Sequence, residues 1–120
     1  MKTKTVLFLL FAITFCSFTT DPPSGWDKIY LKGQLDTSNG PDATEAYTDQ
    51  YNVCVYFYQS VGIVGVSIEN SYGVRVYSNE VNTNWEQQLN IPISSFSNGT
   101  YTLELSNAFG SAWGEFEKEP

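Results

Sequence analysis

Apolar and polar residues alternate along most of the chain from residue 27 onward, and a period of two is typical of half-buried β-strands. No stretch in this part of the chain has the spacing of three and four residues that marks an amphipathic helix. The alternation predicts strands that begin near residues 27, 51, 62, 74, 85, 100 and 111. Short strands separated by turns predict a single all-β domain, an antiparallel β-sandwich of about seven strands.

One segment interrupts the alternation. Residues 36–50 are polar and acidic, and Asn39-Gly40-Pro41 within them is typical of a turn. We expect a long loop over these residues, with the strands on either side joined across it.

The phase of each strand assigns its aromatic residues to the core or to an outer face. Trp85 shares a phase with Leu89 and Ile91, so we expect its ring to point inward. The aromatic residues in outward phases are Tyr30, Tyr56, Tyr58, Tyr77 and Trp113. Exposed aromatic rings on a rigid sheet can stack on sugar rings or anchor a protein partner, although Tyr is also simply a good strand-forming residue.

Tyr101 narrows the sandwich to one topology. It follows the turn Ser97-Asn98-Gly99 directly and begins a predicted strand. In immunoglobulin-like sandwiches a tyrosine at this place returns its hydroxyl to the upstream backbone, an arrangement called a tyrosine corner. The alternative is that Tyr101 is one more inward-facing aromatic residue. The position favours an immunoglobulin-like fold with Tyr101 in a structural role.

The first twenty residues have the layout of an export signal. Lys2 and Lys4 precede an apolar run over residues 6–15 that is too short to cross a bilayer as a helix. We expect cleavage near Thr20 by the general secretory route, and a protein in the periplasm, on the cell surface or outside the cell. The predicted organisation is a signal peptide over 1–20, a linker over 21–26 and the sandwich domain over 27–120.

Lipoprotein processing at Cys16 is the competing interpretation of the same segment, but a lipoprotein signal carries a small residue where this chain has Phe15. In a chain cut after Thr20, Cys54 is the one remaining cysteine, so no intrachain disulfide is expected. We predict a monomer without a transmembrane segment in the mature chain.

The charge balance and the absence of one residue type exclude several functions. The 120 residues carry 13 acidic and 6 basic side chains, a net charge of -7. Nucleic acid is therefore not expected as a partner, because a negatively charged protein is repelled by the phosphate backbone. The chain has no His, which excludes catalysis by an imidazole base.

Candidate chemistry is sparse. Cys54 lies between two valines without a neighbouring base, so its thiol is not expected to be reactive. Oxygen-rich loops can hold Ca²⁺, and residues 36–50 contain four acidic residues, but their spacing does not match an EF-hand and a solvated loop is the preferred interpretation. We predict no catalytic residues, no metal site and no cofactor.

Four segments together carry a family resemblance: residues 66–77, 89–91, 99–105 and 114–116. With these segments the chain resembles the small exported Bacteroides-type proteins grouped as domain of unknown function 3244. The resemblance covers nearly the whole chain after the signal peptide and implies an immunoglobulin-like sandwich with no assigned biochemical role. The closing hairpin is also similar to the C-terminal sorting domains of the type IX secretion pathway.

These observations leave functional hypotheses from three classes. The preferred one is an exported, non-catalytic module that binds a protein or a glycan at the cell envelope. The second is a structural or secretion-sorting appendage. The third is a small hydrolase that uses carboxylates, since the chain offers many Asp and Glu residues.

Overall fold

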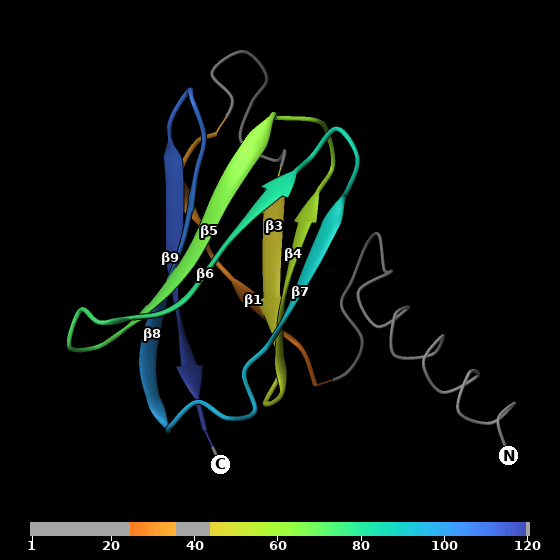
Figure 1. The fold of residues 1–120 in the computed structure, drawn as a ribbon. Coiled ribbons are helices and arrows are strands. Elements are labelled where there is room, and N and C mark those ends of the chain that lie inside the picture. The colour runs from red at the N-terminus through yellow and green to blue at the C-terminus, as the bar shows by residue number, and fades with distance from the viewer. Residues whose placement is uncertain (1–24, 36–43, 120) are drawn as a thin grey trace, which may run out of the picture.

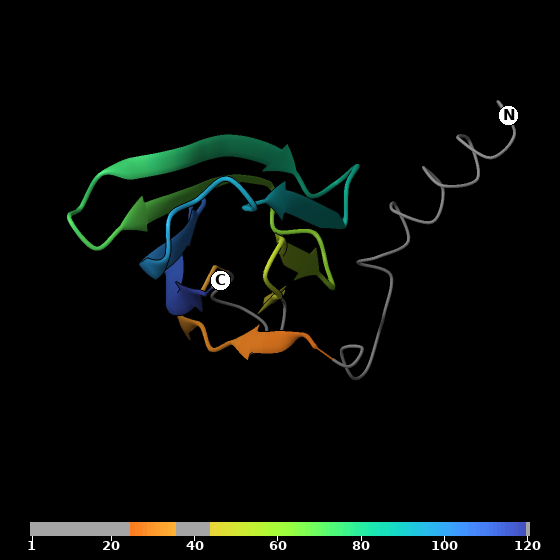
Figure 2. The ribbon, with the colours of Figure 1, turned by 90° about the horizontal axis from the view of Figure 1, so that it is seen from below.

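The computed structural model describes residues 25–35 and 44–119. Within these ranges the chain forms nine β-strands in two antiparallel sheets and no helix (Figure 1). Seen from below, the two sheets lie as separate layers that face each other (Figure 2). The described ranges therefore contain no helix that could span a membrane. The predicted all-β antiparallel sandwich is confirmed.

The two sheets contain four and five strands. The four-stranded sheet has the order β1 (Asp27–Ile29), β3 (Thr44–Thr48), β4 (Asn52–Phe57) and β7 (Gln88–Pro92). The five-stranded sheet has the order β2 (Lys32–Gly33), β9 (Ser111–Lys118), β8 (Gly99–Ser106), β5 (Ile63–Asn70) and β6 (Arg75–Asn82). The chain therefore crosses between the sheets several times, as expected of a sandwich rather than of two hairpin units.

The core lies between the two sheets and is built from the inward phase of each strand. β-Branched and aromatic residues fill it because their side chains pack well on a pleated surface. The largest fully buried side chains are Phe57, Ile29, Ile68, Ile91, Ile93, Leu103, Leu105, Val53, Val55, Val64 and Val66. In β4, β5 and β8 these are the residues whose alternation predicted the strands.

β3 lies in the segment for which the sequence predicted only a loop, so that prediction is wrong for residues 44–48. β3 pairs with β4 along its whole length, from Thr44 opposite Phe57 to Thr48 opposite Val53. Only Ala46 of this strand packs into the main core. A strand with one small core residue has no apolar alternation, and its backbone pairing with β4 is what holds it in the sheet.

The first predicted strand is divided in two. β1 pairs with β3, whereas β2 pairs with β9 in the other sheet, so the chain changes sheets between them. The crossing is tight: a side chain at Gly114 of β9 would place its Cβ 2.5 Å from the Tyr30 carbonyl oxygen and 2.9 Å from Ile29. Gly114 lets the backbone of this connection approach β9 closely.

Tyr101 has the geometry of a tyrosine corner. Its side chain is buried at the start of β8, and its hydroxyl donates a hydrogen bond to the Ser97 carbonyl oxygen at 2.7 Å. The ring stacks on Phe116, with centroids 5.7 Å apart, and lies beside Phe96 at 5.2 Å. The hydroxyl thus fixes the corner before β8 while the ring belongs to the core.

Cys54 and Trp26 differ from their predicted environments. Cys54 is disulfide-bonded, so the expectation of no intrachain bridge is wrong for the full-length chain. That expectation was drawn for a chain without residues 1–20, whereas the full chain contains a second cysteine, Cys16, which lies outside the described residues. Trp26 was assigned to the linker, but it is buried together with Tyr47 and Cys54 in a second, smaller apolar cluster.

Candidate functional site

The structure divides the aromatic residues predicted for the outer faces among separate places. Tyr56 and Tyr58 lie together on the outer face of the four-stranded sheet, with ring centroids 4.8 Å apart in an edge-to-face arrangement. Trp113 lies on the outer face of the other sheet, in register between Lys32 and Glu104. Tyr30 is exposed in the connection between β1 and β2, with the Lys28 ammonium 5.7 Å from its ring centroid. The predicted residues do not form one shared aromatic surface.

Tyr77 was predicted on an outer face, and this placement is wrong. Tyr77 pairs with Ile68, which is fully buried, so both side chains share the inner face of the five-stranded sheet. Its half-buried ring packs against the main core, and its hydroxyl accepts a hydrogen bond from Asn79 at 3.1 Å. The pairing between β5 and β6 shifts at Ile68 and Glu69, and an irregular register of this kind is invisible to a count of alternate residues.

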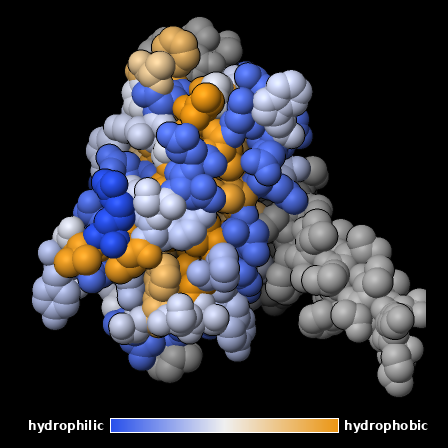
Figure 3. All heavy atoms as spheres, viewed as in Figure 1, coloured by the Kyte–Doolittle hydropathy of each residue, from blue (hydrophilic) through white to orange (hydrophobic). Residues whose placement is uncertain are grey.

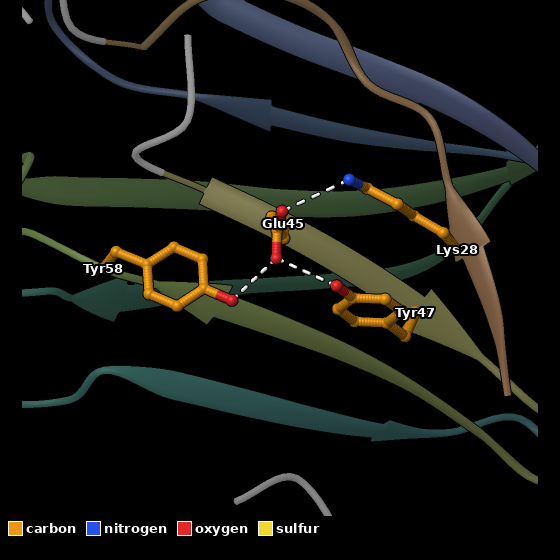
Figure 4. Close-up of polar contacts among 4 residues, drawn as sticks. All are labelled: Lys28, Glu45, Tyr47 and Tyr58. Atoms are coloured by element: carbon orange, nitrogen blue, oxygen red, sulfur yellow. Dashed lines mark hydrogen bonds and ion pairs between the residues drawn. The ribbon is translucent and has the colours of Figure 1, made fainter. Parts of the chain in front are cut away.

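A cluster of polar groups surrounds Glu45 on the outer face of the four-stranded sheet (Figure 4). The phenol hydroxyls of Tyr58 and Tyr47 donate hydrogen bonds to Glu45 Oε1, at 2.6 and 2.9 Å. Lys28 Nζ forms an ion pair with Glu45 Oε2 at 3.2 Å. β1, β3 and the end of β4 each supply members of this cluster, which places these four side chains side by side.

The electrostatics of the cluster keep Glu45 ionised and Tyr58 protonated. Burial raises the pKa of Glu45, but the hydrogen bonds from Tyr58, Tyr47 and Lys28, with the Lys28 charge, outweigh it and leave the pKa below its ordinary value. Burial and the hydrogen bond to Glu45 raise the pKa of Tyr58 well above its ordinary value. Neither group titrates near neutral pH, so the cluster is suited to holding side chains in place rather than to proton transfer.

Three turns meet at one end of the sandwich, the upper end in Figure 1. They are residues 58–62 between β4 and β5, residues 83–87 between β6 and β7, and residues 107–110 between β8 and β9. We call this surface the turn platform. Tyr58 belongs both to the platform and to the Glu45 cluster, so the two are continuous.

Thr83 joins the first two turns of the platform. Its side chain is buried, and its backbone N–H and its hydroxyl both donate to the Gly62 carbonyl oxygen, at 3.0 and 2.7 Å. The same hydroxyl accepts a hydrogen bond from the Val61 N–H at 2.8 Å. A further contact links the Ser60 hydroxyl to the Asn84 side chain.

Asn107 joins the third turn to the first. Its side-chain amide donates to the Val61 carbonyl oxygen at 2.8 Å, and its side-chain oxygen accepts from the backbone N–H groups of Phe109 and Gly110. The platform is thus one hydrogen-bonded unit made from segments far apart in the sequence. Loops fixed in this way present side chains in a defined position on a rigid scaffold.

The platform carries large aromatic side chains that face solvent. Trp85 is 81% exposed, Phe109 is 65% exposed and Tyr58 is 40% exposed. On the face drawn in Figure 3, hydrophobic residues reach the surface at the upper end, over the turn between β8 and β9. An exposed indole adds little to the stability of the fold, because its apolar surface stays in water. Its place on a rigid turn is therefore a reason to look for a ligand there.

Sequence reasoning missed Trp85 and Phe109. Trp85 was predicted to point inward because it shares a phase with Leu89 and Ile91, but β7 begins only at Gln88. The signal that could have placed it is Asn82-Thr83-Asn84 immediately before it, since these residues favour turns and helix caps over strand interiors. Phe109 lies in a similar context, between Asn107 and Gly110.

The acidic residues considered for Ca²⁺ do not form a site within the described ranges. Asp36 and Asp42 lie outside these ranges, and Glu45 is engaged in its own cluster. Asp49 accepts hydrogen bonds from the N–H groups of Tyr51 and Asn52, each at 2.7 Å. No three acidic or cysteine side chains in 25–35 and 44–119 come close enough together to hold a metal ion.

Comparisons with known proteins identify the family and the fold. A family model described as "Domain of unknown function (DUF3244)" matches residues 28–118. The structure is similar to the crystal structure of a DUF3244 family protein with an immunoglobulin-like β-sandwich fold from Bacteroides vulgatus, with a TM-score of 0.69 and 23% sequence identity. The similarity covers 78% of this chain and 99% of that one, and it shows that the sandwich is immunoglobulin-like, as predicted. No curated protein matches the sequence. With the match extending over three quarters of its length, this chain belongs to the DUF3244 family.

Proposed function

We propose that this domain is a non-catalytic binding module of the cell envelope, and that its protein or glycan partner contacts the turn platform. The observation that carries the proposal is the exposure of Trp85 and Phe109 on turns that are hydrogen-bonded to one another. Aromatic residues dominate the energetics of many binding surfaces, because they offer a large contact area at a low cost in side-chain entropy.

The rigidity of the platform supports this assignment. Ordering a flexible loop on binding costs free energy, whereas turns already fixed by Thr83 and Asn107 avoid most of that cost. In immunoglobulin variable domains, loops clustered at one end of the sandwich contact the ligand. The platform has the same kind of location, with a connection from each of three strand pairs.

The non-catalytic part of the proposal has separate support. The polar cluster on the outer face of the four-stranded sheet holds a carboxylate, Glu45, that already accepts hydrogen bonds from two phenols and a lysine. The general acid of a glycosidase must be protonated near neutral pH, which requires a raised pKa. Glu45 has a lowered pKa, so it does not fit the role of that acid.

The location in the envelope is proposed from the sequence. Lys2 and Lys4 before an apolar run support export of the chain, with a binding surface then facing the periplasm or the exterior. The sorting alternative has weaker support: β8, the first strand of the closing hairpin, lies between β9 and β5, and its inward residues are part of the core. A transport machine would reach little of that strand without unfolding the domain.

Binding to envelope material tests the proposal. Purified wild-type protein, the double variant Trp85→Ala/Phe109→Ala and the control Tyr72→Ala are compared on immobilised outer-membrane and periplasmic fractions of the native host. Tyr72 is 89% exposed at the tip of the β5–β6 hairpin, which lies away from the platform (Figure 1). We expect the double variant to bind at least about tenfold more weakly and Tyr72→Ala to bind like wild type. Equal binding by the wild type and the double variant would remove the platform from the proposal.

A further inference from the structure

We infer that Trp85 and the polar residues beside it form a binding site for a neutral glycan. The inference rests on the proposed function and specifies the chemical class of its ligand. It is carried by the conformation of one turn, the composition of its exposed residues and the charge of the chain.

The turn that carries Trp85 is fixed mainly by Asn82. The Asn82 carbonyl oxygen accepts hydrogen bonds from the backbone N–H groups of Trp85 and Glu86, each at 3.0 Å. Its side-chain oxygen accepts from the Asn84 N–H, also at 3.0 Å. Together with the buried Thr83, these bonds hold the backbone in one tight turn, so the indole is presented to solvent from a defined position.

The residues next to Trp85 along this turn have polar, planar side-chain groups. Asn84, Glu86 and Gln87 are exposed on either side of Trp85. The two amides supply donors and acceptors, and the carboxylate supplies acceptors. A pyranose ring has an apolar face of C–H groups and a rim of hydroxyls, so an indole with amides and a carboxylate beside it matches both parts.

A protein partner fits this composition less well. Protein-binding hot spots are aromatic or Arg residues in a patch whose core is depleted of charged and small polar groups and whose rim excludes water. Here the residues on both sides of Trp85 are amides and a carboxylate, which remain hydrated. The Ser60 contact also fixes the Asn84 side chain, so one hydrogen-bonding group is already oriented.

Charge selects neutral over anionic glycans. Residues 82–88 contain Glu86 and no Lys or Arg, and the chain as a whole carries a net charge of -7. A uronate or sulfate group would meet a field of the same sign with no cation in this segment to pair with it. Hydroxyl groups of neutral sugars have no such penalty.

A glycan array tests the inference directly. Full-length protein is applied to neutral oligosaccharides built from glucose, mannose, galactose and xylose, and to oligogalacturonate and heparin fragments as anionic probes. We expect binding to at least one neutral series and none to the anionic ones. Trp85→Ala should weaken that binding at least about tenfold, whereas Trp85→Phe should retain most of it because an aromatic face remains. The control Tyr72→Ala should bind like wild type.

Tryptophan fluorescence gives a second readout on the same proteins. A bound sugar removes water from the indole, so titration with the best neutral oligosaccharide should shift the wild-type emission to shorter wavelength. Trp85→Phe should lose this shift, because Trp26 is buried and Trp113 lies on the outer face of the five-stranded sheet. Thermal melts of the variants establish that they fold, which we expect because Trp85 is exposed.

The outcomes separate this inference from the proposed function. Platform-dependent binding to envelope proteins without binding to neutral glycans overturns the glycan inference and leaves the proposed function standing. Binding to anionic glycans alone overturns the inference in the same way. Neutral-glycan binding that survives Trp85→Ala and Phe109→Ala, or no binding to any array or envelope fraction, overturns both.

Discussion

Among single residues, the hydroxyl groups of Tyr101 and Tyr58 have different roles. The Tyr101 hydroxyl is held beneath the surface and donates to a backbone carbonyl, whereas the Tyr58 hydroxyl lies at the surface and donates to a carboxylate. The first bond fixes a corner of the fold. The second orients a side chain that borders the candidate binding surface.

Tyr101→Phe removes the first of these bonds and leaves the ring in place. We expect a loss of about 1 kcal/mol in the free energy of unfolding, the usual net worth of one hydrogen bond, because water can reach the exposed Ser97 after the change. Denaturant melts measure it. The control Tyr30→Phe, on an exposed ring, should change stability by less than about 0.5 kcal/mol. Equal effects for the two variants would mean that the Ser97 contact contributes nothing to the corner.

The Glu45 cluster predicts a dependence of stability on acid pH. Because the folded pKa of Glu45 is lowered, its stabilisation is present above the unfolded pKa and is lost as pH falls through the folded value. Glu45→Gln should therefore destabilise the protein at pH 7, and the difference from wild type should shrink below about pH 4. Chemical melts across this range measure the difference. Glu117→Gln, an exposed carboxylate on the other sheet, should give no comparable trend; if it does, the effect belongs to net charge and not to the cluster.

At the scale of elements, close approach and pairing shape the strands as much as their own sequences do. β3 is held by its pairing with β4, and β9 passes under the connection between β1 and β2 only because position 114 has no side chain. Distant contacts hold the turns as well, since each turn of the platform is hydrogen-bonded to another turn. Even a small substitution at such a contact should therefore lower the free energy of unfolding.

Gly114→Ala tests the close approach at β9. The new methyl group would lie 2.5 Å from the Tyr30 carbonyl oxygen, and backbone on both sides would have to move. We expect a loss of about 1–3 kcal/mol in the free energy of unfolding, as for overpacked sites. Gly65→Ala is the matched control, because Gly65 also lies inside a strand but its Cβ would come no nearer than 3.4 Å to another residue, Ser106. A thermal or chemical melt in which both variants lose equally would contradict the steric explanation.

Thr83→Val tests the hydrogen bonds of the turn platform with almost no change of shape. Val61 would lose the acceptor for its buried N–H, so we expect a loss of about 1–3 kcal/mol in the free energy of unfolding. If the platform is the binding surface, ligand affinity should also fall, because the Trp85 turn is no longer held in advance. Thr102→Val on the outer face of β8 serves as the control and should leave both quantities near the wild-type values. Normal stability and affinity in Thr83→Val would show that the platform does not depend on these bonds.

At the scale of the whole molecule, export and the disulfide at Cys54 are linked. A chain that begins at Asp21 contains a single cysteine, so cleavage after Thr20 and an intrachain disulfide at Cys54 exclude each other. Charge is also distributed over the whole molecule: on the outer face of the five-stranded sheet, five carboxylates outnumber Lys32 and Arg75, namely Glu69, Glu80, Glu104, Glu115 and Glu117. This face offers no match to anionic surfaces.

Mass spectrometry of the protein from its native host distinguishes a chain cleaved after Thr20 from one with an intrachain disulfide at Cys54. We expect a mature N-terminus between Cys16 and Asp21, since the apolar run is followed by small residues at the positions that a signal peptidase contacts. Alkylation with and without reduction, read in the same intact-mass measurement, reports the state of Cys54. An unprocessed chain in the envelope fraction would contradict the proposed export signal.

Sequence alone predicts the class of the fold, the inward phases of β4, β5 and β8, and the position of Tyr101 after its turn. Each of these depends on neighbours within a few residues, so periodicity and turn chemistry suffice to place them. The family could also be recognised from the sequence, because each segment that carries the resemblance is continuous in the chain.

Other features of the molecule depend on contacts that form only when the chain folds. β3 has one core residue, and it became a strand because β4 supplied its hydrogen-bond partners. The face of Tyr77 depended on a shift in register between β5 and β6. The exposure of Trp85 depended on where β7 begins and on bonds to a turn more than twenty residues earlier, between Thr83 and Val61. Contacts between distant segments leave no periodic trace in the sequence, and this is why the candidate binding surface could not be found before the fold was known.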